Sequence, residues 1–327
     1  MGLSIVTVCM NRREHLLATA PRVAAWPHHR EHLIVDWSSR EPVRREELPE
    51  DPRVRLLRVE GEGRWNLCRA YNFAMAHAHG DLVLKLDADA WPTQAFDPWN
   101  PALAGPLCAF GSGPEGRRGQ FLIERDLFEA VGGFHELLVG YGFDDKDLLA
   151  RLQQFTGELA AALPEAWIGV IPHSDAERAE QGASRGAMAA SQGLAAMRAT
   201  RLANRLLAAN CPWGPRAPRS RYREEARGLW RLEPESLPLP PEKVAGEAEH
   251  ARRMTFWGFF LAIPEVFLEV LPYSLFPPPR KGRWDVRWWH CLWWQTGRRL
   301  LELPVHALVG GHRLLTGQPS GLSPRTR

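Results

Sequence analysis

Short runs of apolar residues alternate with longer stretches of helical spacing along the first ninety residues. The apolar runs are rich in valine, isoleucine and leucine, which is typical of buried strands. The predicted strands are Leu3–Cys9, His32–Asp36, Val54–Val59 and Leu82–Leu86, and the predicted helices are Asn11–Ala25 and Asn66–Ala78. This alternation predicts an α/β fold whose sheet is mainly parallel and flanked by helices.

Polar residues follow three of these predicted strands at the point where each strand ends. The three clusters are Cys9–Arg13, Asp36–Ser39 and Asp87–Asp89. In open parallel sheets, ligands bind beyond the carboxyl ends of the strands. We therefore expect the three clusters to line one crevice.

The most informative cluster is the pair of aspartates at the end of the fourth strand. Asp87 and Asp89 are spaced i, i+2, so on a strand their side chains point to the same face. Two unpaired carboxylates are costly to bury, so they require a cation or a solvated cleft. They could equally be two ordinary surface aspartates at a solvated strand end.

The remaining chain divides by its composition. Gly140–Leu152 carries a dense acidic group that leads into a predicted helix, and a short strand, Trp167–Ile171, ends just before His173. Residues 212–242 are rich in proline and arginine, which indicates a linker or a surface-wrapping loop. We predict a catalytic domain over residues 1–200 and a helical extension, rich in tryptophan and arginine, over residues 201–327.

Charge and cysteine content narrow the function classes. The net charge is only +3, which gives no support for a nucleic-acid partner. Five cysteines without a CxxC spacing argue against a disulfide framework and a zinc site, and favour a reducing cytosol. The N-terminus lacks the basic region of a signal peptide. We expect a cytoplasmic protein.

The last third of the chain contains two unusual segments. Thr255–Phe276 is strongly apolar, but two glutamates and two prolines interrupt it, so we do not predict a transmembrane helix. Arg280–Arg299 mixes five tryptophans with basic residues. This mixture suits a membrane interface or a lipid-linked acceptor. We favour a helical subdomain that packs its tryptophans on the catalytic domain or on a partner subunit, possible peripheral membrane contact being the alternative. The oligomeric state is not predicted.

Several motifs occur in one order along residues 3–180. They are Asn11-Arg12-Arg13-Glu14-His15-Leu16, Arg69-Ala70-Tyr71-Asn72, Leu86-Asp87-Ala88-Asp89, Gly133-Phe134, Gly140-Tyr141-Gly142-Phe143-Asp144-Asp145-Lys146-Asp147 and His173-Ser174. In this order they resemble GT-A glycosyltransferases of the broad family 2 group. The likeness is strongest to the galactosyltransferase-related branch that includes the animal β-1,4-galactosyltransferases.

Two positions depart from that family. Its Gly-Gly-Glu-Asp appears here as Gly142-Phe143-Asp144-Asp145, so the first acidic residue is the shorter aspartate. Val170 stands where the galactosyltransferases have a methionine metal ligand. The resemblance therefore does not carry over the identity of the donor or of the acceptor.

The resemblance implies a role for each motif residue. Asp145 is the expected general base, and Asp144 and Tyr141 are expected to bind the acceptor. Metal is expected on Asp89 and His173, and the imidazole favours manganese, with magnesium as the alternative. The expected donor-binding residues are Arg13, Asp36, Arg69, Asn72 and Asp87.

The implied reaction is metal-dependent, inverting transfer of a sugar from a UDP-sugar donor to a hydroxyl of a glycan or lipid-linked acceptor. One alternative is a catalytically inactive protein of the same fold that binds nucleotide-sugar or carbohydrate. Another is a nucleotidyltransferase. That class would require a glycine-rich, lysine-bearing loop after the first strand, and Asn11-Arg12-Arg13-Glu14 is not such a loop.

Overall fold

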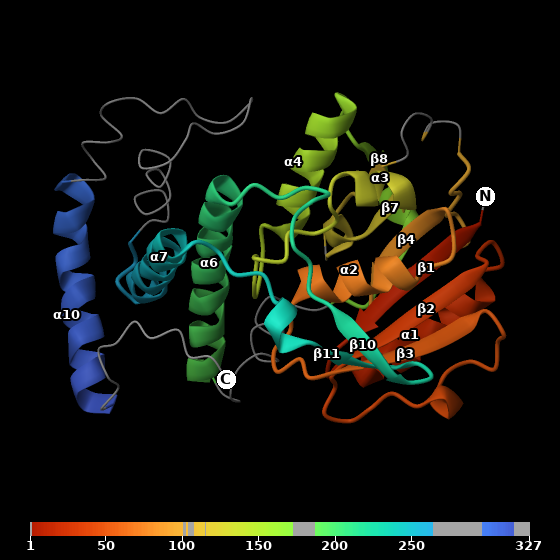
Figure 1. Ribbon diagram of the computed structural model, residues 1–327, viewed down its shortest axis with the longest axis horizontal. Coiled ribbons are helices and arrows are strands. Elements are labelled where there is room, and N and C mark those ends of the chain that lie inside the picture. Colours follow the sequence, from red (N-terminus) through yellow and green to blue (C-terminus); the bar gives the residue numbers. More distant parts are fainter. Residues whose placement is uncertain are drawn as a thin grey trace. The chain divides into compact units, whose positions relative to one another are not determined.

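Figure 1 shows the computed structural model of the chain, which describes residues 2–100, 103, 108–114, 116–172, 187–263 and 296–316. The chain forms two compact units. The first comprises Met1–Asp175 with Pro212–Leu239, and the second comprises Ala176–Cys211 with Pro240–Arg327. The boundaries of these two units differ from the predicted boundary at residue 200. The predicted division into domains 1–200 and 201–327 stays a prediction.

A nine-stranded sheet forms the first unit, and it confirms the predicted α/β fold class. Its parallel centre consists of β1 (Leu3–Cys9), β2 (Glu31–Trp37), β3 (Val54–Glu60) and β4 (Leu82–Asp87). The flanking strands are β6 (Cys108–Gly111), β7 (Phe121–Glu124), β8 (Ala161–Leu163), β10 (Tyr222–Ala226) and β11 (Leu229–Leu232). The strand order is β10-β11-β3-β2-β1-β4-β7-β6-β8. A two-stranded sheet of β5 (Ala90–Pro92) and β9 (Ile168–Val170) lies apart from it.

The register of the central strands aligns their carboxyl ends. Cys9 pairs with Asp36 across β1 and β2, and Val8 pairs with Asp87 across β1 and β4. The three polar clusters that follow these strands therefore begin at the same edge of the sheet. This alignment confirms the topological basis of the predicted crevice.

Helices cover both faces of the sheet, as the alternating strand pattern predicted. The helix α1 (Arg13–Ala25) packs Leu16 and Val23 against core clusters that also contain residues of β1, β2 and β4. The helix α2 (Leu67–His77) contacts β1 and β2, and the Tyr71 hydroxyl donates to the Leu86 carbonyl, 2.9 Å away. Leu84 belongs to the α1 face, whereas Lys85 lies under the Tyr71 ring.

Several short elements complete this unit. They are the helices α3 (Arg125–Ala130) and α4 (Asp144–Thr156) and the 3₁₀ turns Arg45–Glu47, Arg117–Gly119, Glu165–Trp167 and Pro234–Ser236. The turn Arg117–Gly119 leads directly into β7, which is antiparallel to β4. It therefore lies beside the end of β4, where the aspartate pair begins.

The proline- and arginine-rich stretch was predicted to be a linker or surface loop, and this prediction was wrong for much of it. Its β10–β11 hairpin extends the sheet, because β11 pairs in parallel with β3. The Tyr222 and Trp230 rings pack on Phe73 of α2, with centroids 5.1 and 5.5 Å away. These aromatic contacts hold the hairpin on α2. The strands are short, so the proline- and arginine-rich composition of the whole stretch did not indicate them.

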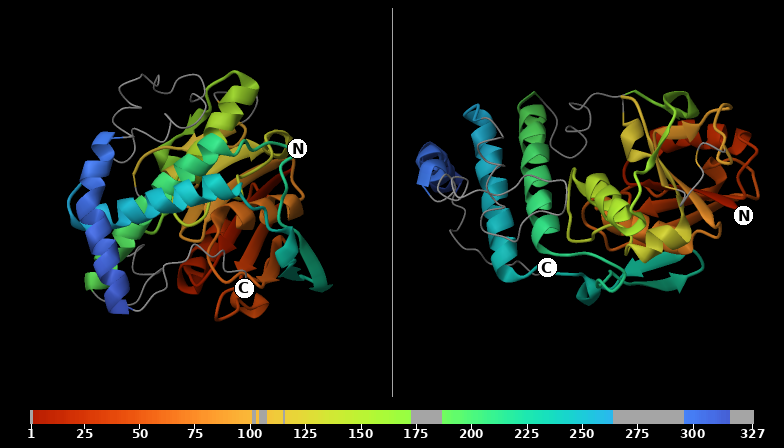
Figure 2. Two further views of the ribbon diagram at one scale, coloured as in Figure 1. Left: turned by 60° about the vertical axis from the view of Figure 1, so that its left-hand side comes forward. Right: turned by 90° about the horizontal axis from the view of Figure 1, so that it is seen from above.

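Three helices are described in the second unit. The helices α6 (Ala187–Asn210) and α7 (Glu242–Phe260) run side by side (Figures 1 and 2), with Leu202, Leu206 and Ala251 in their shared core. The third, α10 (Arg298–Thr316), contacts α7. A helical C-terminal region is thus confirmed. Within the described residues, no helix is long and apolar enough to cross a membrane. The tryptophans at 284–294 lie outside the described residues.

Candidate active site

A fully buried lysine stands at the base of the candidate site. Lys85 and Asp87 are two residues apart on β4, so both side chains leave the strand on the α2 face. The Lys85 Nζ donates to Asp87 Oδ1 and to the Gly119 carbonyl, each 2.7 Å away. A buried ammonium requires such partners, and the lysine thereby joins β4 to the turn before β7.

Two further side chains fix the Asp87 carboxylate. Gln120 donates from Nε2 to Oδ2 over 2.7 Å, and its Oε1 accepts the Asp87 backbone N–H. The Tyr71 hydroxyl lies 3.1 Å from Oδ1. Burial alone would raise the pKa of Asp87, but the Lys85 charge and these hydrogen bonds lower it below its usual value. Asp87 is therefore held ionised in one orientation.

The second pair of carboxylates begins the helix α4. Its N-cap, Phe143, has a φ of +78°, a left-handed conformation that glycine ordinarily supplies. Arg151 secures the helix: its Nε donates to Asp147 over 2.8 Å, and its Nη1 donates to the carbonyls of Val131 and Gly133. Asp144 and Asp145 are thus presented from a fixed first turn, where the helix dipole stabilises anions.

The two pairs converge at Gly119. A Cβ built on this glycine would lie 3.5 Å from Asp145 Oδ2, 3.6 Å from Asp87 Oδ2 and 3.9 Å from Lys85 Nζ. Residues far apart in the sequence therefore surround one small space, and Gly119 leaves that space open because it has no side chain. The structure brings together Asp87 and Asp145, two residues to which the family resemblance assigns roles.

Asp145 is the least satisfied group of this cluster. Its Oδ1 is buried and has no hydrogen-bond partner among the described residues. Burial, and then the neighbouring Asp144 charge, raise the pKa of Asp145 well above its usual value, although Lys85 opposes the shift. Burial also raises the pKa of Asp144. The pKa of Lys85, which burial would lower, is raised by Asp87 and Asp145, so the lysine stays charged.

The predicted metal-binding carboxylate Asp89 lies just beyond β4 and is almost fully buried. Arg12 Nη1 is 3.3 Å from its Oδ2. Carboxylate oxygens are hard ligands that fit manganese or magnesium. Within the described ranges, no three Asp, Glu, His or Cys side chains gather as a metal site. His173, the other predicted ligand, lies outside the described residues.

Two predicted donor-binding residues have partners within the protein. Asp36 is completely buried at the end of β2, where it accepts the N–H groups of Ser39 and Val43 and pairs with Arg58 over 2.6 Å. It holds the loop that follows β2. Arg13 forms a bidentate ion pair with Glu47, so Arg12 is the arginine that the structure places against the aspartate pair.

The other predicted residues surround α2 and the loop before α4. Arg69 forms a bidentate pair with Glu62. Asn72 exchanges two hydrogen bonds with the Phe134 backbone, 2.7 and 2.9 Å long, and so ties α2 to the Gly133 turn. Tyr141 lies in that loop with 44% of its surface exposed. None of these three residues supplies one of the three atoms nearest to a Cβ built on Gly119.

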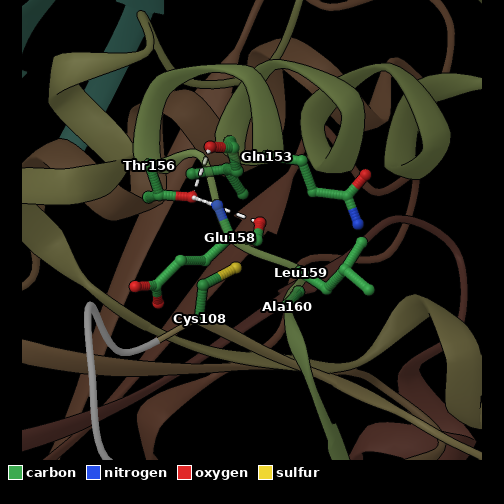
Figure 3. A pocket seen from close by; sticks show the side chains of 7 residues that line it. Cys108, Gln153, Thr156, Glu158, Leu159 and Ala160 are labelled. Carbon is green, nitrogen blue, oxygen red and sulfur yellow. Dashed lines mark hydrogen bonds between the residues drawn. The ribbon is translucent and has the colours of Figure 1, made fainter. Parts of the chain in front are cut away.

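Two hollows of the described surface lie away from the carboxylate cluster. Figure 3 shows one at the far end of α4, lined by Cys108, Gln153 and Glu158, where the Thr156 hydroxyl accepts the Glu158 N–H over 3.2 Å. With about 10 Å³ of space it holds at most a water molecule. Another, of about 160 Å³, is lined by residues that include Asn72 and Tyr222.

Sequence reasoning missed two residues of this site, Lys85 and Gln120, and it preferred Arg13 to Arg12. One signal was available, because a lysine inside an otherwise apolar strand, two residues before an aspartate, is an unusual choice for a buried position. Gln120 carried no signal, since its contribution depends on the antiparallel pairing of β7 with β4.

We expect Lys85→Met to lower the free energy of unfolding by about 3 kcal/mol, because removing one partner leaves carboxylates buried without their counter-charge. Chemical denaturation at neutral pH measures this loss. Lys243→Met, at an exposed lysine of α7, is the matched control and should change stability little. Equal stability of both variants would contradict the assigned role of Lys85.

We expect Asp145→Asn to be more stable than the natural protein at neutral pH. The folded pKa of Asp145 is raised above the unfolded value of about 3.9, so the folded state loses stability as pH rises from that value. The neutral amide removes this loss. Melting curves between about pH 4 and pH 8 should show a difference that grows with pH. A difference that is absent or reversed would contradict the inferred burial of this charge.

Models of two known protein families match parts of the chain. Residues 4–98 match the family model described as glycosyl transferase family 2, and residues 113–167 match the model described as the N-terminal domain of galactosyltransferase. No curated protein matches the sequence significantly. The first match contains the aspartate pair of β4, and the second contains Gly119 and the start of α4.

Solved structures similar to the chain are distant in sequence. A mannosyltransferase from Pyrobaculum calidifontis, in complex with GDP-mannose and Mn²⁺, is 17% identical with a TM-score of 0.45, over 94% of this chain and 82% of its own. Glucosyl-3-phosphoglycerate synthase from Mycobacterium tuberculosis is 17% identical with a TM-score of 0.43, over 61% and 80%. Drosophila β-1,4-galactosyltransferase 7 is 14% identical with a TM-score of 0.42, over 71% and 92%.

These structural similarities are too distant to assign a donor or an acceptor. The two family models match consecutive parts of the chain in the order that the motifs predicted. They confirm the resemblance to the galactosyltransferase-related glycosyltransferases of the GT-A type, and the protein is an enzyme of the glycosyltransferase class.

Proposed function

We propose that the enzyme is a metal-dependent, inverting glycosyltransferase that moves a sugar from a UDP-sugar to a hydroxyl of a glycan or glycolipid. The observation that carries this proposal is the partnerless, buried Asp145 Oδ1 beside the fixed Asp87 carboxylate. A structural carboxylate would have its oxygens satisfied. An unsatisfied oxygen with a raised pKa suits a group that must accept a proton.

In this proposal Asp145 is the general base of a single displacement. The acceptor oxygen forms a bond to the anomeric carbon, while the bond from that carbon to the diphosphate oxygen breaks. The hydroxyl proton passes to Asp145, and UDP leaves with the bonding electrons. Attack from the face opposite the leaving group inverts the anomeric centre. The raised pKa makes Asp145 a stronger base than an ordinary aspartate.

Asp89 and His173 would hold the metal, with manganese favoured over magnesium because imidazole suits softer ions. A bound divalent cation supplies electrostatic stabilisation to the diphosphate leaving group. The buried Asp89 carboxylate, whose hard oxygens suit such an ion, supports this assignment. Arg12, at 3.3 Å from Asp89, would add a donor for a phosphate oxygen.

The substrate contacts extend the proposal to the remaining motif residues. Asp87 would orient the donor, since Lys85, Tyr71 and Gln120 fix its carboxylate. Asp144 would bind acceptor hydroxyls beside the base, and the exposed Tyr141 ring offers a flat surface on which a sugar can stack. Donor roles for Asp36, Arg13, Arg69 and Asn72 rest on the family resemblance.

The cellular setting is part of the proposal. We place the enzyme in the cytoplasm, at the inner face of a membrane where lipid-linked acceptors occur, in the synthesis of a polysaccharide. The four described cysteines, Cys9, Cys68, Cys108 and Cys211, are free and buried, which supports a reducing compartment. Peripheral membrane contact is the alternative to packing for the tryptophan- and arginine-rich segment.

A panel of UDP- and GDP-sugars tests the reaction class through manganese-dependent hydrolysis. With the active donor, Asp145→Asn should turn over at least about a hundredfold more slowly, because the amide cannot accept a proton. Its affinity for the donor should be unchanged. Near-normal turnover would move the base to another residue, first to Asp144. Absence of hydrolysis with every donor, together with tight binding of one, would favour the inactive binding protein.

Asp89→Ala and His173→Ala should each abolish the manganese dependence of UDP binding, because each removes one ligand of the proposed ion. Calorimetric titration with UDP, with and without manganese, measures this. Asp97→Ala, at an exposed aspartate of the same unit, is the control. If both ligand variants keep the affinity of the natural protein, the proposed metal site is wrong.

A further inference from the structure

The helix α10 exposes a row of leucines that no part of the catalytic proposal uses. Leu300 and Leu303 are 70% and 62% exposed, and Leu314 and Leu315 are 88% and 90% exposed. At 100° per residue, these four and Ala307 lie within an arc of about 120° on one side of the helix. Contiguous exposed apolar surface of this kind marks an interaction site.

The opposite side of α10 is the side that packs on α7. Val305 and Glu302 are buried there, and Glu302 lies 3.6 Å from His250 of α7. The His312 and Trp257 rings are in contact, with centroids 5.0 Å apart. These residues lie on the side of α10 opposite the leucines. The helix is therefore packed on α7, and the leucines are exposed because they lie on its other side. Among the described residues, the helix packs one face on α7 and has no partner on its apolar face.

The charge of the chain indicates what this face binds. Residues 264–327 contain nine arginines and lysines but only four acidic residues, whereas the whole chain has a net charge of +3. The positive charge is therefore concentrated in the segment that carries α10, and the rest of the chain is slightly negative. A second copy would bring the same positive charge to the leucine face. An anionic lipid surface would instead attract it.

We propose that the leucine face of α10 binds the surface of membranes that contain anionic phospholipid. The helix would lie in the plane of the interface with the four leucines among the acyl chains, and the net positive charge of residues 264–327 would add attraction to anionic lipid. Two weak attractions, insertion of the leucines and electrostatic attraction to anionic lipid, together give reversible attachment to the membrane. This deepens the membrane contact of the proposed function, but it does not depend on sugar transfer.

Co-sedimentation of the full chain with lipid vesicles tests the proposal. The natural protein should bind vesicles of phosphatidylcholine mixed with phosphatidylglycerol, and binding should weaken with added salt. Leu300→Gln, Leu303→Gln, Leu314→Gln and Leu315→Gln combined should weaken binding at least about tenfold, the order of magnitude that burial of one leucine contributes. The control combines Leu159→Gln with Leu239→Gln, two leucines outside this unit that are each 85% exposed, and should bind normally.

Several outcomes would overturn the proposal. They are absence of vesicle binding by the natural protein, equal binding to pure phosphatidylcholine, and unchanged binding by the leucine variant. A natural protein that is dimeric, with a monomeric leucine variant, would show self-association instead. Melting curves verify folding, and Leu314→Gln with Leu315→Gln alone serves if the combined variant does not fold. Because vesicle binding requires no donor, it can fail while donor hydrolysis succeeds, or succeed while hydrolysis fails.

Discussion

The buried ammonium of Lys85 is the interaction on which the candidate site depends. Three carboxylates, those of Asp87, Asp144 and Asp145, gather around it, and their pKa values respond to its charge. Without a cation, three carboxylates that are buried or partly buried could not gather so closely. One lysine cannot satisfy three carboxylates, however. Asp87 takes its direct hydrogen bond, and Asp145 keeps a buried oxygen without a partner.

Asp87 and Asp145 differ in their hydrogen bonds because different elements of the fold position them. Lys85 and Asp87 come from β4, and Gln120 directly precedes β7, the antiparallel partner of β4. Asp145 comes from the first turn of α4, which Arg151 and a left-handed Phe143 hold in place. Strained backbone also occurs at Asn11 and Ser38, after β1 and β2. Backbone strain of this kind persists only where surrounding structure supports it, and it gathers at functional sites.

Much of the fold and the centre of the site could be predicted from sequence because they obey local rules. Apolar runs predicted the four central strands, and the i, i+2 spacing of Asp87 and Asp89 indicated the edge of the sheet where the candidate site lies. The β10–β11 hairpin escaped prediction because its stability comes from packing on Phe73, far away in the sequence. Gln120 escaped prediction because its hydrogen bonds to Asp87 also join residues far apart in the sequence. Asp36 and Arg13 were predicted to bind the donor. Each also forms an ion pair within the protein, and only the folded chain reveals these partners.

The account's central claim is that Asp145 assists one direct displacement at the anomeric carbon. Proton NMR of donor hydrolysis, recorded before the released sugar equilibrates, identifies the anomer that forms first. For an α-linked UDP-sugar the account predicts the β-anomer, because water activated by Asp145 attacks opposite the diphosphate. Release of the α-anomer first would require a retaining mechanism and would contradict the role assigned to Asp145.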